Sequence, residues 1–439
     1  MIIVDRALEI REREGAPIRV GIIGAGYMGR GIALHMPITG MRLSVVCNRS
    51  LSQAERAFSQ ATGEKPQMVS SAVRLEEEIR KGNPAVTDDP HVICDAEGLD
   101  VVVEATGEIE FGAEVVLRAI DRGKHVVLMN AELDATLGPM LKARADRAGV
   151  VITNTDGDEP GVAMNLVRFA RTLGYEPVAA GNIKGMIDHY RTPETQQAFA
   201  EKVGQKPKHI TSFADGTKLS METTVLANAT GFGVAQRGMT GPKCDHVSEL
   251  LDLLSPAAML EGGIVDYCVG AAPHTGAWVI GYNEDPIKQQ YMSYFKMGGG
   301  PFYLFYTPYH LPHVQILTTI ARAALFRDAT VAPQGGPRCE VLTLAKRPLK
   351  RGETLDGIGG FMSYGWIDNA KEARAHRSLP MGVSEGCVLN RDVGRDEAVR
   401  YDDVRLPEGR LCDRLRAEQE ARFATADQGP GGSYSGQSG

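Results

Sequence analysis

The sequence lacks the features of several broad classes of protein. It has no apolar run of 18 or more residues, as a membrane-spanning helix would require. Acidic residues outnumber basic residues by 55 to 48, so the formal net charge is −7 and the basic excess typical of nucleic-acid binding is missing. The opening stretch, MIIVDRALEIRERE, is charged and has no apolar core like that of a signal peptide. We therefore expect a cytoplasmic protein that acts on a small molecule and binds neither a membrane nor a nucleic acid.

The cysteines also argue against two kinds of stabilising cross-link. There are seven of them, they are scattered, and no C-x-x-C pair occurs. An odd and dispersed set is typical of reduced thiols in a cytoplasm. The sequence therefore predicts neither a disulfide framework nor a zinc site.

The first part of the chain has the pattern of an α/β domain. At 439 residues the chain is long enough for two or three domains. From Arg19 to about Thr155, short apolar runs alternate with amphipathic stretches, which predicts a doubly wound parallel sheet of the Rossmann type over residues 1–155. The expected strands are RVGII, LSVVC, VVVEATG, HVVLMN and VVITNT. The charged stretch Leu75–Pro90 is expected to be a surface helix and loop.

Two further segments with different sequence patterns follow the first domain. Residues 156–335 mix strand-like runs with glycine turns, which favours an α+β substrate-binding, catalytic and dimerisation domain. The segment Pro301–Phe326 ends in a helical pattern that is expected to pack back against the first domain. Residues 336–425 carry short strands and turns, typical of a small all-β module. Residues 426–439 are glycine-rich and polar and are expected to be a flexible tail.

A glycine-rich loop follows the first expected strand. In the motif GAGYMG, Gly24 suits a tight turn, Gly26 allows a pyrophosphate to approach the backbone, and Gly29 allows close contact between helix and strand. Tyr27 and Met28 open the helix, whose free N–H groups would face the phosphates. A purely structural glycine turn is the alternative. The strand before the motif and the helix after it favour a dinucleotide site.

The end of the second expected strand bears on the choice of cofactor. A fold selective for NAD normally places Asp or Glu there to bind the ribose hydroxyls. This chain has Asn48, Arg49 and Ser50 instead, and Arg49 with Ser50 can bind a 2′-phosphate through charge-assisted hydrogen bonds. We therefore predict NADPH as the cofactor. The alternative is that Arg49 is only a solvated surface charge.

Two more strand ends are expected to line the cofactor. Ala105, Thr106 and Gly107 follow a strand at the carboxyl edge of the sheet, where ligands bind in such folds. Asn130 and Glu132 follow the next strand and are placed to reach the nicotinamide. For these two the alternative is that they only cap the turn.

Charged residues gather among the glycines of the second domain. Asp158 and Glu159 follow a strand and are candidates to bind a divalent metal ion or a substrate hydroxyl, unless they are solvated acids of a turn. Lys184 and Asp188 are four residues apart and would share a face of a helix, as catalytic groups for proton transfer. A surface ion pair of little consequence is the alternative.

A second pair repeats the spacing of four. Lys218 and Glu222 are also candidate catalytic residues, with Lys218 binding substrate oxygens. Three glycines at Gly298–Gly300 predict either a hinge or an anion-binding nest. His310 is a candidate acid or base, although a buried structural histidine is as good an interpretation.

Taken together, these segments resemble a known family. The stretches VGIIGAGYMGRG, VVVEATG, VVLMNAE, GNIKGMIDHYRTPET, SFADGTKLSMETTVLANATG and FYTPYHLPHVQ are similar to the 1-deoxy-D-xylulose-5-phosphate reductoisomerase-like oxidoreductases. These are relatives of homoserine dehydrogenase with a C-terminal SAF-type β module, and the likeness covers almost the whole chain. It implies an NADPH-dependent homodimer that rearranges and reduces 1-deoxy-D-xylulose 5-phosphate in isoprenoid biosynthesis. It also implies a site formed by Lys184, Asp188, Lys218 and Glu222, with Mg²⁺ or Mn²⁺ on Asp158 or Glu159.

Two other interpretations stay open at this point. One is a reductase or dehydrogenase of the homoserine type, which leaves the carbon skeleton of its substrate unchanged. The other is a regulator that binds NADPH or a sugar acid without turnover. The clustering of polar residues among the glycines of the second domain argues against the regulator.

Overall fold

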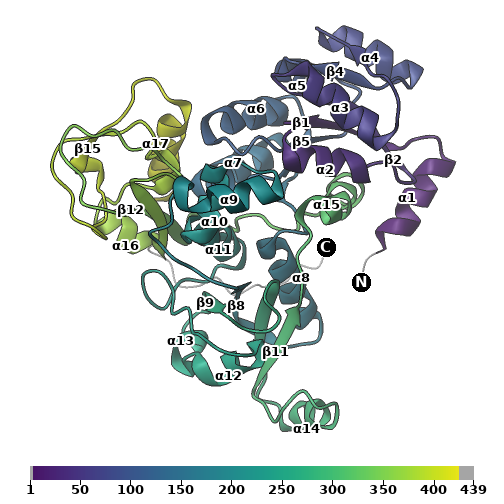
Figure 1. Cartoon of the computed structure of the whole chain (residues 1–439). Coiled ribbons are helices and arrows are strands. Elements are labelled where there is room, and N and C mark those ends of the chain that lie inside the picture. Colours follow the sequence, from purple (N-terminus) through teal and green to yellow (C-terminus); the bar gives the residue numbers. More distant parts are fainter. Residues whose placement is uncertain (1–2, 425–439) are drawn as a thin grey trace.

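A sheet of seven parallel strands organises the first third of the chain. The structure is a computed structural model that describes residues 3–424 (Figure 1). The strand order of this sheet is β3-β4-β2-β1-β5-β6-β7. All of its pairings are parallel. Strands β2, β3 and β4 lie on one side of β1, and β5, β6 and β7 lie on the other. This reversal of strand order creates the switch point at which ligands bind in such sheets. The predicted doubly wound sheet is confirmed. Its strands are β1 (Ile18–Ile23), β2 (Met41–Cys47), β3 (Gln67–Met68), β4 (Ala85–Thr87), β5 (Val101–Glu104), β6 (His125–Leu128) and β7 (Ile152–Asn154).

Helices connect these strands and cover the sheet. They are α1 (Val4–Arg13), α2 (Tyr27–His35), α3 (Leu51–Ala61), α4 (Ala72–Lys81), α5 (Pro90–Asp95), α6 (Ile109–Asp121) and α7 (Ala131–Ala148). The expectation for Leu75–Pro90 is wrong in one respect. The helix is present as α4, but the following residues form β4, which pairs with β2 inside the sheet. Ala85 and Val86 are fully buried there. Two apolar residues are too short a run to predict a strand from the sequence, but their burial in the sheet stabilises one.

The middle of the chain forms a second, four-stranded sheet in the order β11-β10-β8-β9. The strands are β8 (Glu176–Lys184), β9 (Ile264–Val269), β10 (Ala277–Tyr282) and β11 (Phe302–Thr307). Strand β10 is antiparallel to both neighbours, and β8 and β9 are parallel. This mixed sheet with helices confirms the expected α+β texture. The helices of this part are α8 (Glu159–Thr172), α9 (Pro193–Val203), α10 (Pro207–Ala214), α11 (Thr217–Thr230), α12 (Leu250–Leu253), α13 (Pro256–Leu260), α14 (Pro286–Tyr294) and α15 (Pro312–Ala321).

Helix α15 returns to the first sheet, as the sequence predicts. Ile316 and Ile320 are fully buried in the same hydrophobic cluster as Ile32 of α2. Gly31 of α2 allows this approach, because a Cβ at that position would lie 2.6 Å from the His313 ring. The segment Pro301–Phe326 thus spans both parts of the molecule, since β11 belongs to the second sheet and α15 packs on the first.

The C-terminal module consists mainly of strands and turns but is not all-β. Its strands are β12 (Cys339–Ala345), β13 (Ser363–Asn369), β14 (Val388–Leu389) and β15 (Val404–Arg405), and they pair as two antiparallel hairpins. Two helices accompany them, α16 (Ala370–Ala375) and α17 (Leu411–Phe423). Neither helix was expected. The helix α17 alternates charged and apolar residues without a strong apolar face of its own, which is why its sequence is a weak signal.

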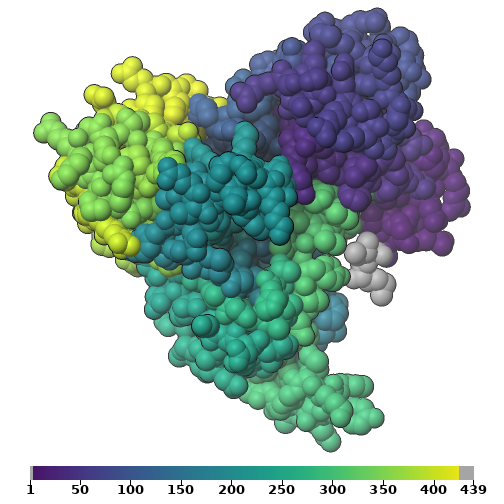
Figure 2. Space-filling model, viewed as in Figure 1, coloured from purple at the N-terminus to yellow at the C-terminus, as the bar shows by residue number. Residues whose placement is uncertain are grey.

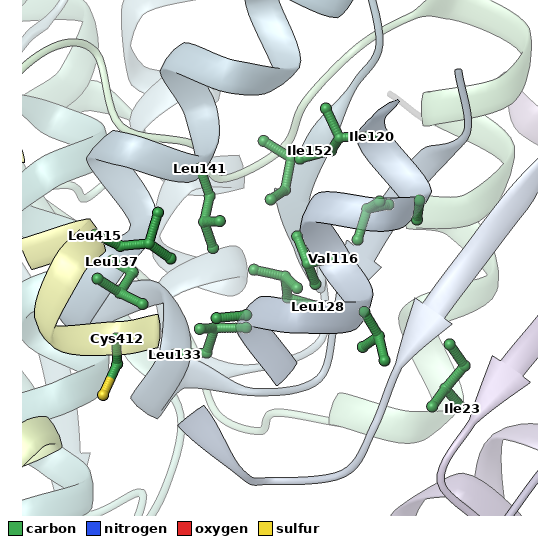
Figure 3. Close-up of a cluster of buried hydrophobic side chains, with 14 of the residues drawn as sticks. Ile23, Val116, Ile120, Leu128, Leu133, Leu137, Leu141, Ile152, Cys412 and Leu415 are labelled. Carbon is green, nitrogen blue, oxygen red and sulfur yellow. The ribbon is translucent and has the colours of Figure 1, made fainter. Parts of the chain in front are cut away.

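The three parts share hydrophobic cores. Leu415 and Cys412 of α17 pack in one cluster with Leu137 and Leu141 of α7, as Figure 3 shows. Because burial of such side chains supplies most of the driving force for folding, the module is joined to the first domain by its core. The boundaries predicted at residues 155, 335 and 425 therefore stay predictions.

The view of the whole molecule places the parts side by side. In Figure 2 the teal segment that contains α9 and α10 lies between the purple N-terminal part and the yellow-green C-terminal module, and α14 projects at the bottom. All seven cysteines are buried and unpaired, as expected. Among residues 3–424 no helix combines the length and the apolar character needed to cross a bilayer. The expected tail at 426–439 lies outside the described residues.

Candidate active site

The glycine loop between β1 and α2 has the geometry that its sequence predicts. Gly24 has φ = +108°, and a Cβ there would lie 2.6 Å from the Ala105 carbonyl oxygen. A Cβ on Gly29 would lie 1.9 Å from the carbonyl oxygen of Gly24, so helix and strand touch at this point. At Gly26, by contrast, an added Cβ would meet no atom within 4 Å. The protein itself does not need a glycine at Gly26, and the bare backbone there fits the approach of a pyrophosphate to the first turn of α2.

The residues after β2 surround the loop. The Asn48 side chain accepts a hydrogen bond from the backbone N–H of Ala25 at 3.1 Å and donates one to the Ser50 carbonyl at 3.1 Å. Asn48 therefore joins the two loops that would hold the adenosine half of a dinucleotide. Arg49 is exposed, and within residues 3–424 it forms no ion pair. Its guanidinium group is thus available to a ligand phosphate.

The carboxyl ends of β5 and β6 are joined by a buried carboxylate that the sequence analysis did not single out. Glu104 accepts a hydrogen bond from the Thr106 N–H at 2.8 Å and another from the Asn130 side-chain amide at 2.9 Å, and the Thr106 hydroxyl also bonds to it. Burial raises the pKa of Glu104. Asn130 also caps α7 by accepting from the Leu133 N–H at 3.0 Å. Because the oxygen and the amide of Asn130 are both engaged within the protein, the alternative that it only caps the turn is favoured, and a contact with the cofactor stays a prediction. Ala105, Thr106 and Gly107 are partly exposed at this edge, as a cofactor contact would require.

Six charged side chains from four elements meet just beyond this edge, and we call them the charged cluster. Helices α7 and α8 begin directly after β6 and β7, so their first residues lie at the carboxyl edge of the sheet. Strand β8 and helix α11 bring the remaining members from the second part of the chain. The cluster consists of Glu132 (α7), Asp158 and Glu159 (start of α8), Lys184 (end of β8), and Lys218 and Glu222 (α11).

The two lysines of the cluster are held differently. The Lys184 Nζ lies 2.6 Å from Glu159 Oε1 and 3.1 Å from Glu222 Oε2, which are hydrogen-bond distances. The Lys218 Nζ lies 3.6 Å from Glu132 Oε1 and 3.7 Å from Glu222 Oε1. Lys184 is therefore tightly bound between two carboxylates, whereas Lys218 is attracted by two carboxylates without a short hydrogen bond to either.

Solvent reaches the cations of the cluster more than its anions. The side chains of Lys184 and Lys218 are 20% and 16% exposed, while those of Glu159 and Glu222 are each 3% exposed. The carboxylates of Glu159 and Glu222 thus form a buried floor, and the two lysine side chains are the more exposed members of the cluster.

Burial and pairing shift the titration of the cluster in opposite directions. Burial raises the pKa of Asp158 well above its usual value, and the neighbouring carboxylates of Glu222 and Glu159 add to the increase against the attraction of Lys218. Burial also acts on Glu159, but the Lys184 ammonium outweighs it and holds the pKa of Glu159 below its usual value. The pKa values of Lys184 and Lys218 are raised, because their carboxylate partners outweigh the effect of burial. Burial likewise raises the pKa of Glu222, so the cluster combines two lysines whose pKa values are raised with two carboxyl groups, Asp158 and Glu222, whose pKa values are also raised.

Two further residues, His310 and Asn182, extend the cluster. His310 Nε2 lies 3.6 Å from Glu159 Oε2, and its other ring nitrogen is 2.8 Å from the Thr275 hydroxyl. Asn182, on β8, donates a hydrogen bond to Glu222 Oε2 at 3.1 Å. The sequence analysis noted His310 only as one of two equal interpretations and did not single out Asn182. No local spacing links either residue to Glu159 or Glu222, so only the folded chain shows the association.

The proposed pairing of Lys184 with Asp188 is wrong. Lys184 is the last residue of strand β8, so the two residues do not follow one another on a helix face. Asp188 lies in the loop beyond it and forms an ion pair with Arg191 at 2.9 Å, with 39% of its side chain exposed. By contrast, Lys218 and Glu222 lie one turn apart on α11, as their spacing predicts.

The three carboxylates at Asp158, Glu159 and Glu222 have the spacing of a metal site, since one oxygen of each lies within 4.8 Å of the others. Divalent cations such as Mg²⁺ prefer such oxygen ligands. However, the Lys184 ammonium lies at hydrogen-bond distance from both Glu159 and Glu222, in the position that a cation between them would need. The residues as arranged therefore do not fit a resident Mg²⁺ or Mn²⁺.

The three glycines at Gly298–Gly300 lie away from the cluster. They connect α14 to the start of β11, whereas His310 follows the other end of that strand. Gly298 and Gly300 have φ = +101° and +75°, which suits a tight connection. The nest interpretation has no support at this site, and the segment serves as a turn.

Comparison with known proteins matches the two halves of this site to two families. Residues 20–154 match the NAD-binding domain of homoserine dehydrogenase. Residues 157–316 match the catalytic domain of oxidoreductase DRL, and this range holds all of the charged cluster except Glu132. The chain thus has the domain composition of an NAD(P)-dependent oxidoreductase, as its sequence predicts.

Individual relatives agree with this class. Homoserine dehydrogenase of Pseudomonas aeruginosa is 27% identical over 227 residues, which are 50% of this chain and 49% of the relative. Homoserine dehydrogenase of Neisseria gonorrhoeae is 28% identical over 136 residues, 31% of this chain and 28% of the relative. This chain therefore spans at most about half the length of the curated relatives that it matches.

Solved structures resemble the chain only weakly. Myo-inositol 2-dehydrogenase from Lactobacillus plantarum has a TM-score of 0.33 at 16% identity, covering 61% of this chain and 75% of that one. A probable dehydrogenase from Thermotoga maritima has a TM-score of 0.36 at 14% identity, covering 61% and 73%. Likenesses of this size carry no information about the substrate.

Proposed function

We propose that the chain is an NADPH-dependent oxidoreductase that reduces a carbonyl group of a small hydroxylated substrate at the charged cluster. The observation that carries the proposal is the pair of ammonium groups, Lys184 and Lys218, at the carboxyl edge of the dinucleotide-binding sheet. The strand order β1-β5-β6-β7 sets the glycine loop and the cluster on the same edge, about three strand spacings or roughly 14 Å apart. A dinucleotide whose pyrophosphate lies at Gly26 would extend along this edge, over Thr106, toward the cluster.

Selection of NADPH rests on the residues after β2. Arg49 is exposed and the position lacks a carboxylate that would repel a 2′-phosphate. Charge-assisted hydrogen bonds from a guanidinium to a phosphate are among the stronger polar contacts. Asn48 holds this loop against the glycine loop, so Arg49 and Ser50 are set beside the adenosine ribose.

The geometry of the charged cluster suggests a role for each of its lysines. NADPH, when bound, supplies a hydride to the carbonyl carbon. The Lys218 ammonium, which has no short hydrogen bond to a carboxylate, binds the carbonyl oxygen and gives it a proton as negative charge develops there. Lys218 then regains its proton from solvent, so that each turnover consumes one hydride and one proton. Lys184 is fully engaged with Glu159 and Glu222, so its role is to balance the charge of the floor and to orient the substrate.

The cluster needs no metal for these steps, since Lys184 supplies the positive charge between the carboxylates. We therefore expect turnover to persist in the presence of a chelator. Loss of turnover in EDTA, restored by Mg²⁺ or Mn²⁺, would show that the metal displaces Lys184 and would overturn this part of the proposal.

A reductoisomerase is the more specific form of the proposal. It is supported by the match of residues 157–316 to the DRL catalytic domain and by the resemblance of the second-domain motifs. A reductase of the homoserine type, without rearrangement, is the second candidate and is supported by the relatives of the first half of the chain. The same resemblance also implies that the chain forms a homodimer, and sedimentation velocity tests this oligomeric state.

One experiment separates these forms. NADPH oxidation is followed with 1-deoxy-D-xylulose 5-phosphate and with a panel of hydroxy-ketones and aldehydes, and the carbon connectivity of the product is determined by NMR. A branched product supports the reductoisomerase, and an unchanged skeleton supports the plain reductase. The Lys218→Met variant should keep only a small residual turnover, whereas the exposed control Lys350→Met should keep full turnover. NADPH binding without turnover on any carbonyl would contradict both forms and favour a regulator.

A further inference from the structure

The C-terminal module reaches the two segments that carry the lysines of the charged cluster. One segment is the loop 185–192, which directly follows Lys184. The other is residues 215–220, which begin α11 and contain Lys218. The module residues that contact them come from β12, β13 and the adjoining loops, and none of these residues belongs to the cluster itself.

Lys346, just after β12, joins both segments at one atom. Its Nζ lies 2.8 Å from Asp215 Oδ2 and donates hydrogen bonds to the carbonyl oxygens of Arg191 at 2.8 Å and Gly360 at 2.7 Å. The side chains are 3% and 0% exposed, so the ion pair is buried. The ammonium group thus donates one hydrogen bond to the loop 185–192 and one to the module, and it forms an ion pair with the segment 215–220.

Asp215 also contacts the first residue of α11, so it connects Lys346 to that helix. Its second carboxylate oxygen accepts a hydrogen bond from the Thr217 N–H at 2.9 Å, at the first residue of the helix. The Thr217 hydroxyl in turn accepts from the Gly365 N–H of β13 at 2.8 Å, and the Ser220 hydroxyl donates to the Gly365 carbonyl at 3.2 Å. The first turn of α11, with Lys218 in it, is therefore fixed to β13 on both sides of Lys218.

The loop after Lys184 is fixed by aromatic contacts with the same strand. His189 stacks on Tyr364 with ring centroids 4.7 Å apart and meets the edge of Trp366 at 4.3 Å. His189 Nδ1 is also 2.8 Å from the Asp215 carbonyl oxygen. Tyr190 donates a hydrogen bond to Asp396 of the module at 2.9 Å. The loop, α11 and the module thus form one connected unit.

We propose that the C-terminal module is a positioning element of the active site and that Lys346 is the residue that sets the separation of Lys184 and Lys218. Lys346 touches neither substrate nor cofactor; it acts through Asp215 and the loop 185–192. Misplacement of a catalytic group by about 1 Å can lower a rate by about 100-fold, so a small shift of α11 relative to β8 is enough to matter. The proposal rests on the proposed function for its kinetic consequence but not for its structural one.

The test uses the full chain with two variants and a matched control. Lys346→Met removes the ammonium but leaves Asp215 as an unpaired buried acid. The double variant Asp215→Asn/Lys346→Met leaves no buried charge and is expected to fold where the single variant does not. Lys350→Met, in the same module, breaks only an exposed ion pair with Asp392.

The first readout does not depend on activity. Hydrogen exchange of the backbone amides in 185–192 and 215–222 should increase in the double variant, whereas exchange in its strands β1 and β5 should match the wild type. The control variant should match the wild type in all of these segments. Unchanged exchange in both segments would overturn the proposal.

The second readout is kinetic. We expect kcat of the double variant to fall at least tenfold while its Kd for NADPH is unchanged, because the glycine loop is not touched. In a Lys218→Met background the same double substitution should have little further effect on kcat, since the residue being positioned is gone. Losses that multiply, or a kcat equal to that of Lys350→Met, would overturn the proposal. If Lys218→Met itself keeps full turnover, the proposed function fails instead, and the exchange experiment still decides the positioning role.

Discussion

Replacing Lys184 by Met probes the charged cluster most deeply, because this lysine holds two buried carboxylates. Its Nζ is within hydrogen-bond distance of Glu159 and Glu222, which are each 3% exposed. Removing one partner of a buried ion pair typically lowers the free energy of unfolding by about 3–5 kcal/mol, since a buried charge is left uncompensated. We expect a loss of this size for Lys184→Met at pH 8.

The loss should depend on pH with a definite sign. Without the ammonium, burial raises the pKa of Glu159 and Glu222 in the folded state above the unfolded value of about 4.3. A carboxyl group with a raised folded pKa favours the folded state at low pH, and this contribution disappears as pH rises through the folded pKa. The difference between wild type and variant should therefore be smaller at pH 5 than at pH 8.

The assay is urea denaturation at both pH values, with Lys350→Met as the control. The Lys350 pair is exposed, with side chains 74% and 58% accessible, and such pairs contribute little to stability. If Lys184→Met behaved like this control, or if its loss of stability were the same at pH 5 and pH 8, the carboxylates would not depend on Lys184 and the description of the cluster would be wrong.

Three further predictions concern the cofactor site and a neighbouring carboxyl group. Arg49→Ala should raise the KM for NADPH roughly tenfold or more and leave the KM for NADH nearly unchanged, because only the 2′-phosphate loses a charged partner; equal effects on both cofactors would refute the assignment. Gly26→Ala should fold normally but bind NADPH weakly, whereas Gly29→Ala should lower the melting temperature, since its Cβ would lie 1.9 Å from a backbone oxygen; circular dichroism melting and fluorescence titration separate the two, and a reversed order would contradict the loop assignment. Burial raises the pKa of Asp134 to about 7, so its contribution to stability is present at pH 4 and is lost as pH rises through 7. Asp134→Asn should thus unfold at higher urea than wild type at pH 8 and not at pH 4, and a constant difference across this range would refute the shift.

Local sequence patterns were enough to predict the dinucleotide-binding part of the site. The roles of Gly24, Gly26 and Gly29 depend on backbone conformation and on contacts between β1 and α2, which adjoin in the sequence. The pair Lys218–Glu222 was predictable for the same reason, because both residues lie on one helix. Spacing in the sequence translates into distance only where the secondary structure is known.

The same rule explains the errors. Lys184 was paired with Asp188 on the assumption of a helix, but β8 continues to Lys184 and its actual partners, Glu159 and Glu222, are 25 and 38 residues away. Glu132 joins the site through α7, whose first turn is set by the strand order of the first sheet. Contacts across such separations come from tertiary packing, which no local pattern encodes.

The C-terminal module shows a further limit. Its short strands were predicted from turns and apolar runs, but its connection to the active site was not. That connection depends on Lys346 and on the stacking of His189 against Tyr364, which bring residues from distant parts of the chain together. Helix α17 was missed because its sequence has no strong apolar face of its own, although it packs on α6 and α7 of the first domain.

The most direct test of the central claim is a crystal structure of the chain with NADP⁺. The account predicts the pyrophosphate at Gly26, the 2′-phosphate beside Arg49, and the C4 atom of the nicotinamide facing Lys184 and Lys218 across a space the size of a small carbonyl compound. A nicotinamide ring bound away from both lysines would contradict the proposed chemistry.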